Sequence, residues 1–269
     1  MKPCGTCTLA ATASLVDSPD LINAVFGSGV FDSSRMLTLA RQFVTDDVIA
    51  AIAREHRKGR RLLVLTTSLD TQRPVIWNMG AIAASGVPGS EELFRRIMTA
   101  SASIPGIFTP TYITTEANGR QLEEMHVDGG VVSNVFILPD DLLVRNLRLS
   151  MRSKGNVYVI MNGKLAPSFD MVDGKTTDIV GRAVSTMTQT HSRGTLQATY
   201  DFTRRNGMGF HLTSIPPDVK DGGTIAFDTD EMRRLYAYGV TYAASKSAWS
   251  STPFEQRPPT ASIAAATRP

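Results

Sequence analysis

An aspartate followed by two glycines constrains this chain more than any other stretch. Residues 121–127 (QLEEMHV) alternate in the manner of a strand, and Asp128, Gly129 and Gly130 follow them directly. Glycine accepts backbone angles that other residues avoid, so the pair is expected to turn the chain away at the strand end. The carboxylate would then lie at the mouth of a sheet. Because Asp-Gly-Gly also occurs in ordinary turns, the motif alone leaves both a structural and a catalytic role open.

Composition places the chain among ordinary globular proteins. Of its 269 residues, 42% are hydrophobic and 20% are charged, and the net charge of +3 is too small to indicate a nucleic-acid partner. Basic clusters at 54–61 and 145–154 are interpreted as solvated helix ends and turns, with a phospholipid-facing role as the alternative. No run approaches the roughly 18 apolar residues of a membrane span, and residues 1–18 lack the pattern of a signal peptide. As it stands, the chain is expected to be cytoplasmic.

The two cysteines, Cys4 and Cys7, form a Cys-x-x-Cys pair near the start of the chain. Such a pair is typical of a redox site or of half a zinc site, but no second pair of ligands follows and no strand precedes it. We therefore expect no metal and no cofactor.

Strand-like and helix-like segments alternate along the chain, which predicts an α/β fold with a mostly parallel sheet covered by helices on both faces. We expect a single domain over residues 1–254 and a disordered tail over 255–269, which is rich in proline and alanine. Asn118 and Gly119 predict a tight hairpin turn. Helices are expected at 8–16, 33–55 (two, with a break at 45–47), 91–102, 176–189, 196–206 and 228–246, and strands at 61–67, 74–79, 112–114, 121–127, 156–161 and 211–215.

Two motifs together resemble the patatin-like phospholipases. Residues 100–110 (ASASIPGIFTP) match a segment that this family places a short distance ahead of its Asp-Gly-Gly motif, and Asn134 follows the motif here as well. Further matches are residues 67–72 with Trp77, and residues 158–163. The resemblance extends from near the N-terminus to about Phe254 and implies a three-layer patatin-like sandwich.

The resemblance also implies a chemistry. The family hydrolyses acyl esters with a serine–aspartate dyad, its serine lies in a Gly-x-Ser-x-Gly elbow, and a glycine-rich loop supplies the oxyanion hole. A hydroxyl needs an adjacent base to become a nucleophile, and the tetrahedral oxyanion needs preorganised N–H donors. Asp128 matches the family's aspartate, so the resemblance assigns it the role of the base. The implied partner is a lipid or small ester, with peripheral membrane contact possible and the oligomeric state open.

The expected elbow departs from the family pattern. At its place the chain reads Gly5, Thr6, Cys7, Thr8 and then leucine, so cysteine replaces the serine and leucine replaces the final glycine. The family's first strand and oxyanion loop would precede Cys7, where the sequence has only six residues. We therefore expect a patatin-type domain that lacks its N-terminal strand and loop.

Three hypotheses follow. The chain is a lipid acyl hydrolase or carboxylesterase with Asp128 as base and Cys7 as nucleophile, or it is a weak or inactive remnant that acts as a folded or binding module. The third is that the reading frame begins further upstream. The sequence does not distinguish phospholipids from short-chain esters as substrates.

Overall fold

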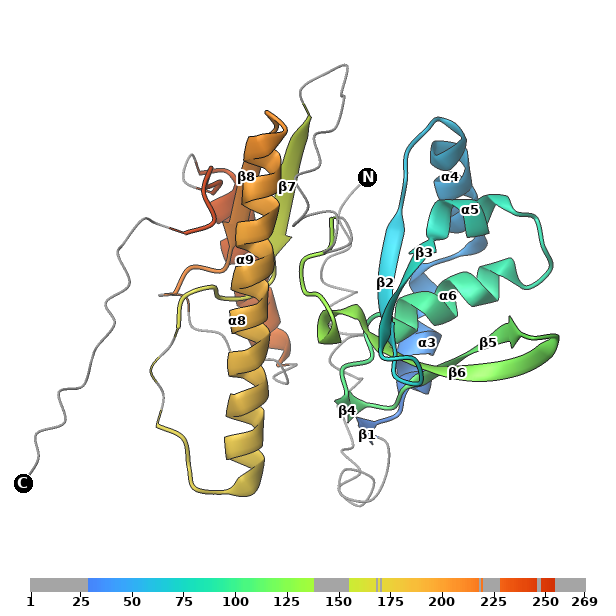
Figure 1. Ribbon diagram of the computed structural model, residues 1–269, viewed down its shortest axis with the longest axis horizontal. Helices are drawn as coiled ribbons and strands as arrows, with labels where there is room; N and C mark the ends of the chain where they lie inside the picture. The colour runs from blue at the N-terminus through green and yellow to red at the C-terminus, as the bar shows by residue number, and fades with distance from the viewer. Residues whose placement is uncertain are drawn as a thin grey trace, which may run out of the picture.

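The computed structural model describes residues 29–137, 155–167, 169, 171–217, 219, 228–245 and 248–254. The expected elbow, Gly5 to Thr8, and the helix expected at 8–16 lie outside these residues, as does the tail expected at 255–269. Figure 1 shows the elements up to β6 gathered on one side, and β7, β8 and the long helix α8 on the other.

A four-stranded sheet in the order β3-β2-β6-β5 forms the centre of the first part. Every pairing in it is antiparallel. In β2 and β6 the partners are Thr66 with Asp128 and Ser68 with His126. The bounds are β2 Leu63–Ser68, β3 Arg73–Asn78, β5 Thr111–Ala117 and β6 Arg120–Asp128.

The prediction of a mixed α/β fold is confirmed, but the mostly parallel sheet is wrong for this largest described sheet. Only residues 69–72 separate β2 from β3, and only Asn118 and Gly119 separate β5 from β6. Parallel neighbours need a crossover of a dozen or more residues, so these short connections require antiparallel pairing. β3 alternates between exposed and half-buried residues, and it is therefore not buried on both faces as its apolar composition suggested.

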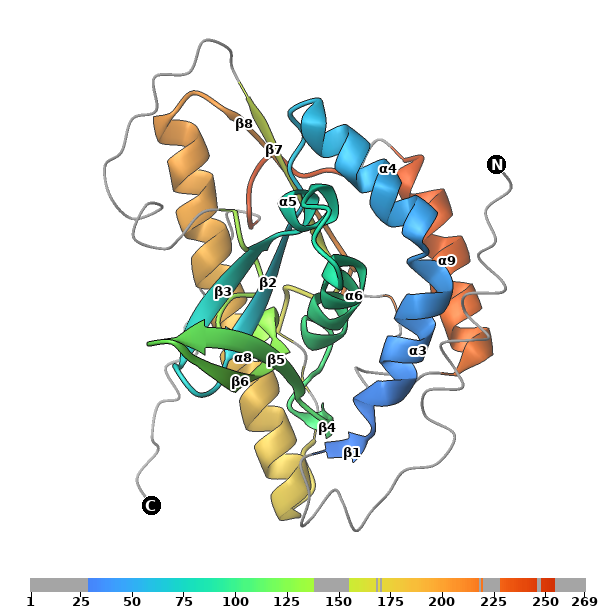
Figure 2. The ribbon, with the colours of Figure 1, turned by 90° about the vertical axis from the view of Figure 1, so that its right-hand side faces the viewer.

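Helices cover one face of this sheet in two layers. Figure 2 shows α6 (Ser90–Ala100) beside the sheet, with α3 (Ser33–Phe43) and α4 (Asp46–Arg57) beyond it. The predicted break between α3 and α4 is confirmed, because Thr45 is the N-cap of α4. A short helix, α5 (Met79–Ala84), follows β3 directly. The core between these layers consists of Ile49, Met79, Phe94, Ile97, Ala100 and Ile113.

Two smaller parallel pairs complete the strands of the described residues. β1 (Gly29–Phe31) pairs with β4 (Gly106–Phe108), and the rings of Phe31 and Phe108 lie 5.9 Å apart. β7 (Asn156–Met161) pairs with β8 (Gly209–Ser214), which confirms both strands predicted there. Their buried side chains pack on α8 around Leu196.

The helices predicted at 176–189 and 196–206 are one helix, α8 (Thr176–Arg205). Hydroxyls in the segment expected to break it bond back to the helix: Ser192 Oγ donates to the carbonyl of Thr188 and Thr195 Oγ1 to that of His191. A glycine inside a helix costs about 1 kcal/mol of stability. At Gly194 the packing of the fully buried Leu196 offsets this cost. The last helix, α9 (Thr229–Ala243), begins after an Asp228 N-cap.

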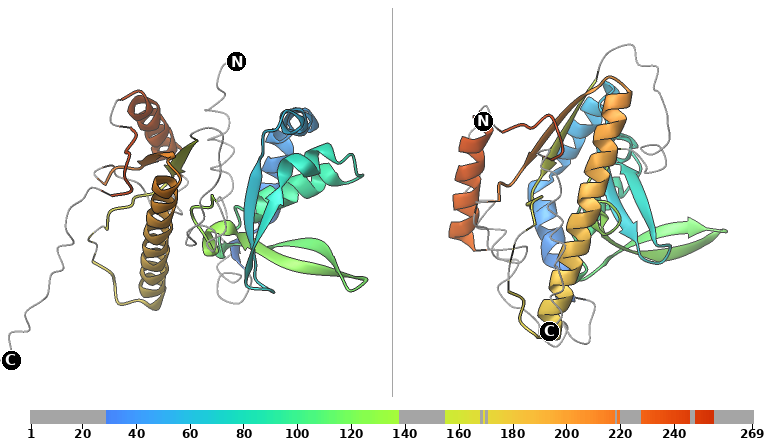
Figure 3. Two further views of the ribbon diagram at one scale, coloured as in Figure 1. Left: turned by 45° about the horizontal axis from the view of Figure 1, so that its top comes forward. Right: turned by 60° about the vertical axis from the view of Figure 1, so that its left-hand side comes forward.

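The segment after β6 joins the two parts of the molecule. Asn134 Nδ2 donates to Ser192 Oγ of α8 over 3.0 Å, and Val135 lies in the core formed by β7, β8 and α8. In Figure 3 the segment directly after β6 lies between the two parts, and the β5–β6 hairpin projects away from it.

The β5–β6 turn gives the first prediction. Asn118 has φ 53° and Gly119 has φ 72°, so both residues occupy the left-handed region that favours asparagine and glycine. Gly119→Ala is expected to lower the free energy of unfolding by about 1–2 kcal/mol, the cost of that conformation for a residue with a Cβ. Gly163→Ala is the matched control, because Gly163 lies outside the left-handed region and a Cβ there meets open space. Urea unfolding measures both, and equal losses would contradict the turn geometry.

Candidate active site

Asp128 is the last residue of β6, and its backbone is held on two sides. Its N–H donates to the carbonyl of Ser103 over 3.0 Å, and its own carbonyl accepts from Thr67 Oγ1 over 3.0 Å. One bond comes from the segment after α6 and the other from β2. The position of the residue is therefore fixed by tertiary contacts and not by the turn alone.

The Asp128 side chain folds over the turn that follows it. Oδ1 accepts the N–H of Gly130 over 2.6 Å, in the first turn of the 3-10 helix η2 (Gly129–Val131). The carboxylate is half-buried, and burial raises its pKa above the ordinary value, while the Gly130 N–H acts in the opposite direction. A raised pKa makes the carboxylate a stronger proton acceptor.

The glycines serve a different purpose from the one expected. Neither Gly129 nor Gly130 has a positive φ, so unusual backbone angles do not explain them. A Cβ on Gly129 would lie 2.5 Å from the carbonyl oxygen of Leu65 in β2, and a Cβ on Gly130 would overlap Asn134 Oδ1. Close packing of the turn against the β2 backbone therefore requires glycine at 129, whereas a Cβ at 130 would displace the end of the Asn134 side chain.

The two motifs that carry the family resemblance meet at this point. Ser101 Oγ donates to the Leu65 carbonyl over 2.8 Å, the same carbonyl that Gly129 approaches. The Ser103 carbonyl accepts the Asp128 N–H. Residues 100–110 thus hold the start of the Asp-Gly-Gly turn against β2, which explains why the two motifs occur together.

Three hydroxyl groups in the segments around Asp128 bond to the backbone, and that of Thr66, the β2 partner of Asp128, contacts Trp77 and His126. Thr67, Ser101 and Ser133 each donate to a main-chain carbonyl, the last to Val135 over 2.8 Å. Within the described part of the chain, no side-chain hydroxyl donates to the Asp128 carboxylate. The structure thus brings Asp128, Gly129 and Gly130 together, while Gly5, Thr6, Cys7 and Thr8 lie outside the described residues.

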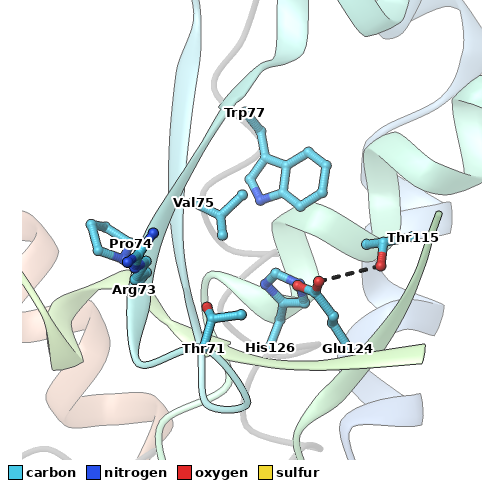
Figure 4. A pocket seen from close by; sticks show the side chains of 8 residues that line it. All are labelled: Thr71, Arg73, Pro74, Val75, Trp77, Thr115, Glu124 and His126. Carbon is cyan, nitrogen blue, oxygen red and sulfur yellow. Dashed lines mark hydrogen bonds and ion pairs between the residues drawn. The ribbon is translucent and has the colours of Figure 1, made fainter. Parts of the chain in front are cut away.

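A pocket that the sequence did not indicate opens beside the candidate base. Its volume is about 590 Å³, and Figure 4 shows its lining side chains. They come from the β2–β3 turn, β3, β5 and β6, so no single stretch of sequence reveals them. The alternation of side chains along β3 as far as Trp77 was the available sequence signal. The lining residues are Thr71, Arg73, Pro74, Val75, Trp77, Thr115, Glu124 and His126.

His126 lies fully buried at the base of this pocket. Trp77 Nε1 donates to Thr66 Oγ1 over 2.8 Å, and Thr66 Oγ1 lies 3.0 Å from His126 Nδ1. With the indole proton on its oxygen, the Thr66 hydroxyl is free to donate to Nδ1, which places the imidazole proton on Nε2. Nε2 lies 3.4 Å from Glu124 Oε2 without the alignment of a hydrogen bond.

These contacts favour a structural role for His126. Burial lowers the pKa of His126, and the neighbouring Glu124 opposes that effect. The order Thr66–His126–Glu124 resembles a catalytic triad, but Thr66 is fully buried and does not line the pocket. A substrate in the pocket therefore does not reach its hydroxyl.

Two further properties concern the described residues only. No cluster of three or more histidine, cysteine, aspartate or glutamate side chains in them has the arrangement of a metal site. None of their helices combines the length and the apolar character that a membrane crossing requires.

Asp128→Asn tests the electrostatics of the turn. The variant keeps an acceptor for the Gly130 N–H and removes the charge. Because the folded-state pKa is raised, the carboxyl contributes stability below its ordinary pKa of 3.8, and that contribution is lost as pH rises through the folded-state value. The variant should therefore unfold at higher urea concentration than the wild type at about pH 7, with the difference shrinking toward about pH 3. A difference of opposite sign would contradict the raised pKa.

Comparisons with known proteins agree with the two motifs. A search of curated proteins finds no match. Residues 11–141 match the family model described as patatin-like phospholipase, a range that includes Asp128 and begins after Cys7. The predicted resemblance is thus confirmed over residues 11–141 by the match to the patatin-like phospholipase model.

Proposed function

We propose that this protein is a lipid acyl hydrolase that cleaves carboxylic esters with Asp128 as the general base and Cys7 as the nucleophile. The observation that carries the proposal is the half-buried Asp128 carboxylate, fixed at the end of β6 with a raised pKa, inside the residues that match the family. The family supports a lipid acyl hydrolase in general. The dyad and the preference for phospholipid or short-chain esters are the finer parts of the proposal.

Support for Cys7 comes from its position and from the hydrogen bonds of three hydroxyls in the described segments around Asp128. It occupies the serine position of the expected elbow, between Thr6 and Thr8. The hydroxyls of Thr67, Ser101 and Ser133 are committed to main-chain carbonyls, so none of these three is activated by the base. A thiol is intrinsically a strong nucleophile once it loses its proton.

The proposed reaction balances protons in two steps. Asp128 takes the thiol proton as the Cys7 sulfur attacks the ester carbonyl, and the protonated carboxyl then passes that proton to the leaving alcohol, which leaves an acyl thioester on Cys7. Water attacks the thioester while Asp128 accepts its proton, and that proton returns to the sulfur as the free acid departs. A base whose pKa is raised accepts each proton more readily than an exposed carboxylate.

We further propose that residues 1–254 act as one domain. The bond from Asn134 to Ser192 and the place of Val135 in the core around α8 support this, because both tie the turn after Asp128 to the rest of the chain. A surface contact with membranes is part of the same proposal, since a phospholipid substrate resides there.

Hydrolysis of a short-chain p-nitrophenyl ester tests the dyad. Asp128→Asn should lower kcat/KM by about 10²–10⁴-fold, the usual contribution of a positioned base. Cys7→Ala should abolish turnover and also the acyl adduct that mass spectrometry detects on the acid-quenched wild type.

Two variants serve as matched controls, and both should keep wild-type rates. Asp201→Asn removes an exposed carboxylate on α8 that accepts from Gln197, and Cys4→Ala removes the other cysteine. Full activity in either dyad variant would show that the dyad is wrong. A folded wild-type protein with neither turnover nor adduct would favour the binding module instead.

A further inference from the structure

The pocket beside Asp128 holds two opposite charges that do not neutralise each other. Arg73 is exposed at one side and makes no ion pair within the described residues. Glu124 lies across the pocket in Figure 4, where Thr115 Oγ1 donates to its Oε1 over 3.3 Å. Its other neighbour is the imidazole of His126, whose Nε2 lies 3.4 Å from Oε2 and whose pKa burial lowers. Among the residues that the structure describes, the pocket therefore offers a guanidinium without an ion pair and a carboxylate with no lysine or arginine partner.

A buried donor at its base has no acceptor in good alignment. His126 is fully buried, and its Nε2 has no hydrogen-bond partner among the described residues. Figure 4 shows the imidazole and the Glu124 carboxylate directed toward each other. A buried donor without an acceptor costs free energy. A polar ligand that moves the Glu124 carboxylate into alignment with Nε2 would recover that free energy.

An aromatic wall completes the pocket. Trp77 is half-buried, and its Nε1 bond to Thr66 together with the ring of His126 at 5.7 Å fixes the indole in place. Indole faces attract ammonium groups, most strongly where water is partly excluded. A volume of about 590 Å³ lies within the range of small-molecule sites.

We infer that this pocket binds a small zwitterion that carries a phosphate and an ammonium group, as in phosphocholine. Glu124 and the Trp77 indole receive the ammonium, because one supplies a negative charge and the other a π face. Arg73, with the Thr71 hydroxyl beside it, receives the phosphate, for which a guanidinium has matching donors. The separation of the two protein charges selects a ligand whose own charges are separated.

The pocket and the candidate base share one face of β6. Glu124, His126 and Asp128 are alternate residues, so His126 stands about 7 Å along the strand from Asp128. A phospholipid headgroup in the pocket would thus hold the ester near the base. This lipid source of the zwitterion rests on the proposed function, whereas binding of free phosphocholine does not.

Isothermal titration calorimetry with the full chain tests the inference. Phosphocholine should bind with one site, and choline and inorganic phosphate should each bind about tenfold more weakly or worse, because each engages one charge only. Glu124→Gln and Arg73→Gln should each weaken phosphocholine binding about tenfold or more, because each removes one charge and keeps the side-chain length.

The matched controls are Glu123→Gln, the exposed acid on the opposite face of β6, and Arg120→Gln at the hairpin tip; both should bind like the wild type. Thermal melting of each variant verifies that it is folded. No heat with phosphocholine, or wild-type affinity in the folded Glu124→Gln and Arg73→Gln variants, would overturn the inference. The p-nitrophenyl ester has no headgroup, so loss of hydrolysis and loss of binding are separate results.

Co-sedimentation with phosphatidylcholine vesicles identifies the source of the zwitterion. If Glu124→Gln weakens both vesicle and phosphocholine binding, the ligand is a lipid headgroup. If it weakens phosphocholine binding alone, the ligand is a soluble zwitterion, and the recognition chemistry stands in both cases.

Discussion

The close contact between Gly129 and the Leu65 carbonyl of β2 is the constraint on which the site depends. It brings the end of β6 so near to β2 that a Cβ has no room. The same carbonyl accepts from Ser101, and the adjacent Asp128 N–H bonds to Ser103. Three segments distant in sequence therefore converge on one turn, and the Asp128 carboxylate is positioned by the contacts of its own backbone.

Burial also shifts the pKa values of two side chains on β6, Asp128 and His126. It raises the pKa of Asp128, which improves the carboxylate as a proton acceptor, and it lowers the pKa of His126, which disfavours the protonated imidazole. Within the described residues, His126 is the one basic side chain within ion-pair distance of Glu124 at the pocket. One face of β6 thus carries the proposed base, Asp128, at its end and the inferred binding pocket next to it, with the buried His126 between them.

Local patterns predicted the elements better than their arrangement. The left-handed turn at Asn118 and the helix break at Thr45 could be predicted from the sequence because each depends on neighbouring residues in the chain. The antiparallel sheet was missed although its hairpin connections are too short for a crossover. The role of Gly129 was misread because the carbonyl that excludes a Cβ belongs to a strand some sixty positions earlier in the chain. The pocket was invisible because β3, β5 and β6 each supply only part of it.

The central claim is that Asp128 is a half-buried carboxylate held ready as a base. The most direct test is a carbon-13 NMR titration of its carboxyl group in the full chain, with the resonance assigned by its absence in Asp128→Asn. The account predicts a pKa above the ordinary value of 3.8. A pKa at or below that value would mean that the Gly130 hydrogen bond outweighs burial, and the carboxylate would then be a turn residue and not a prepared base.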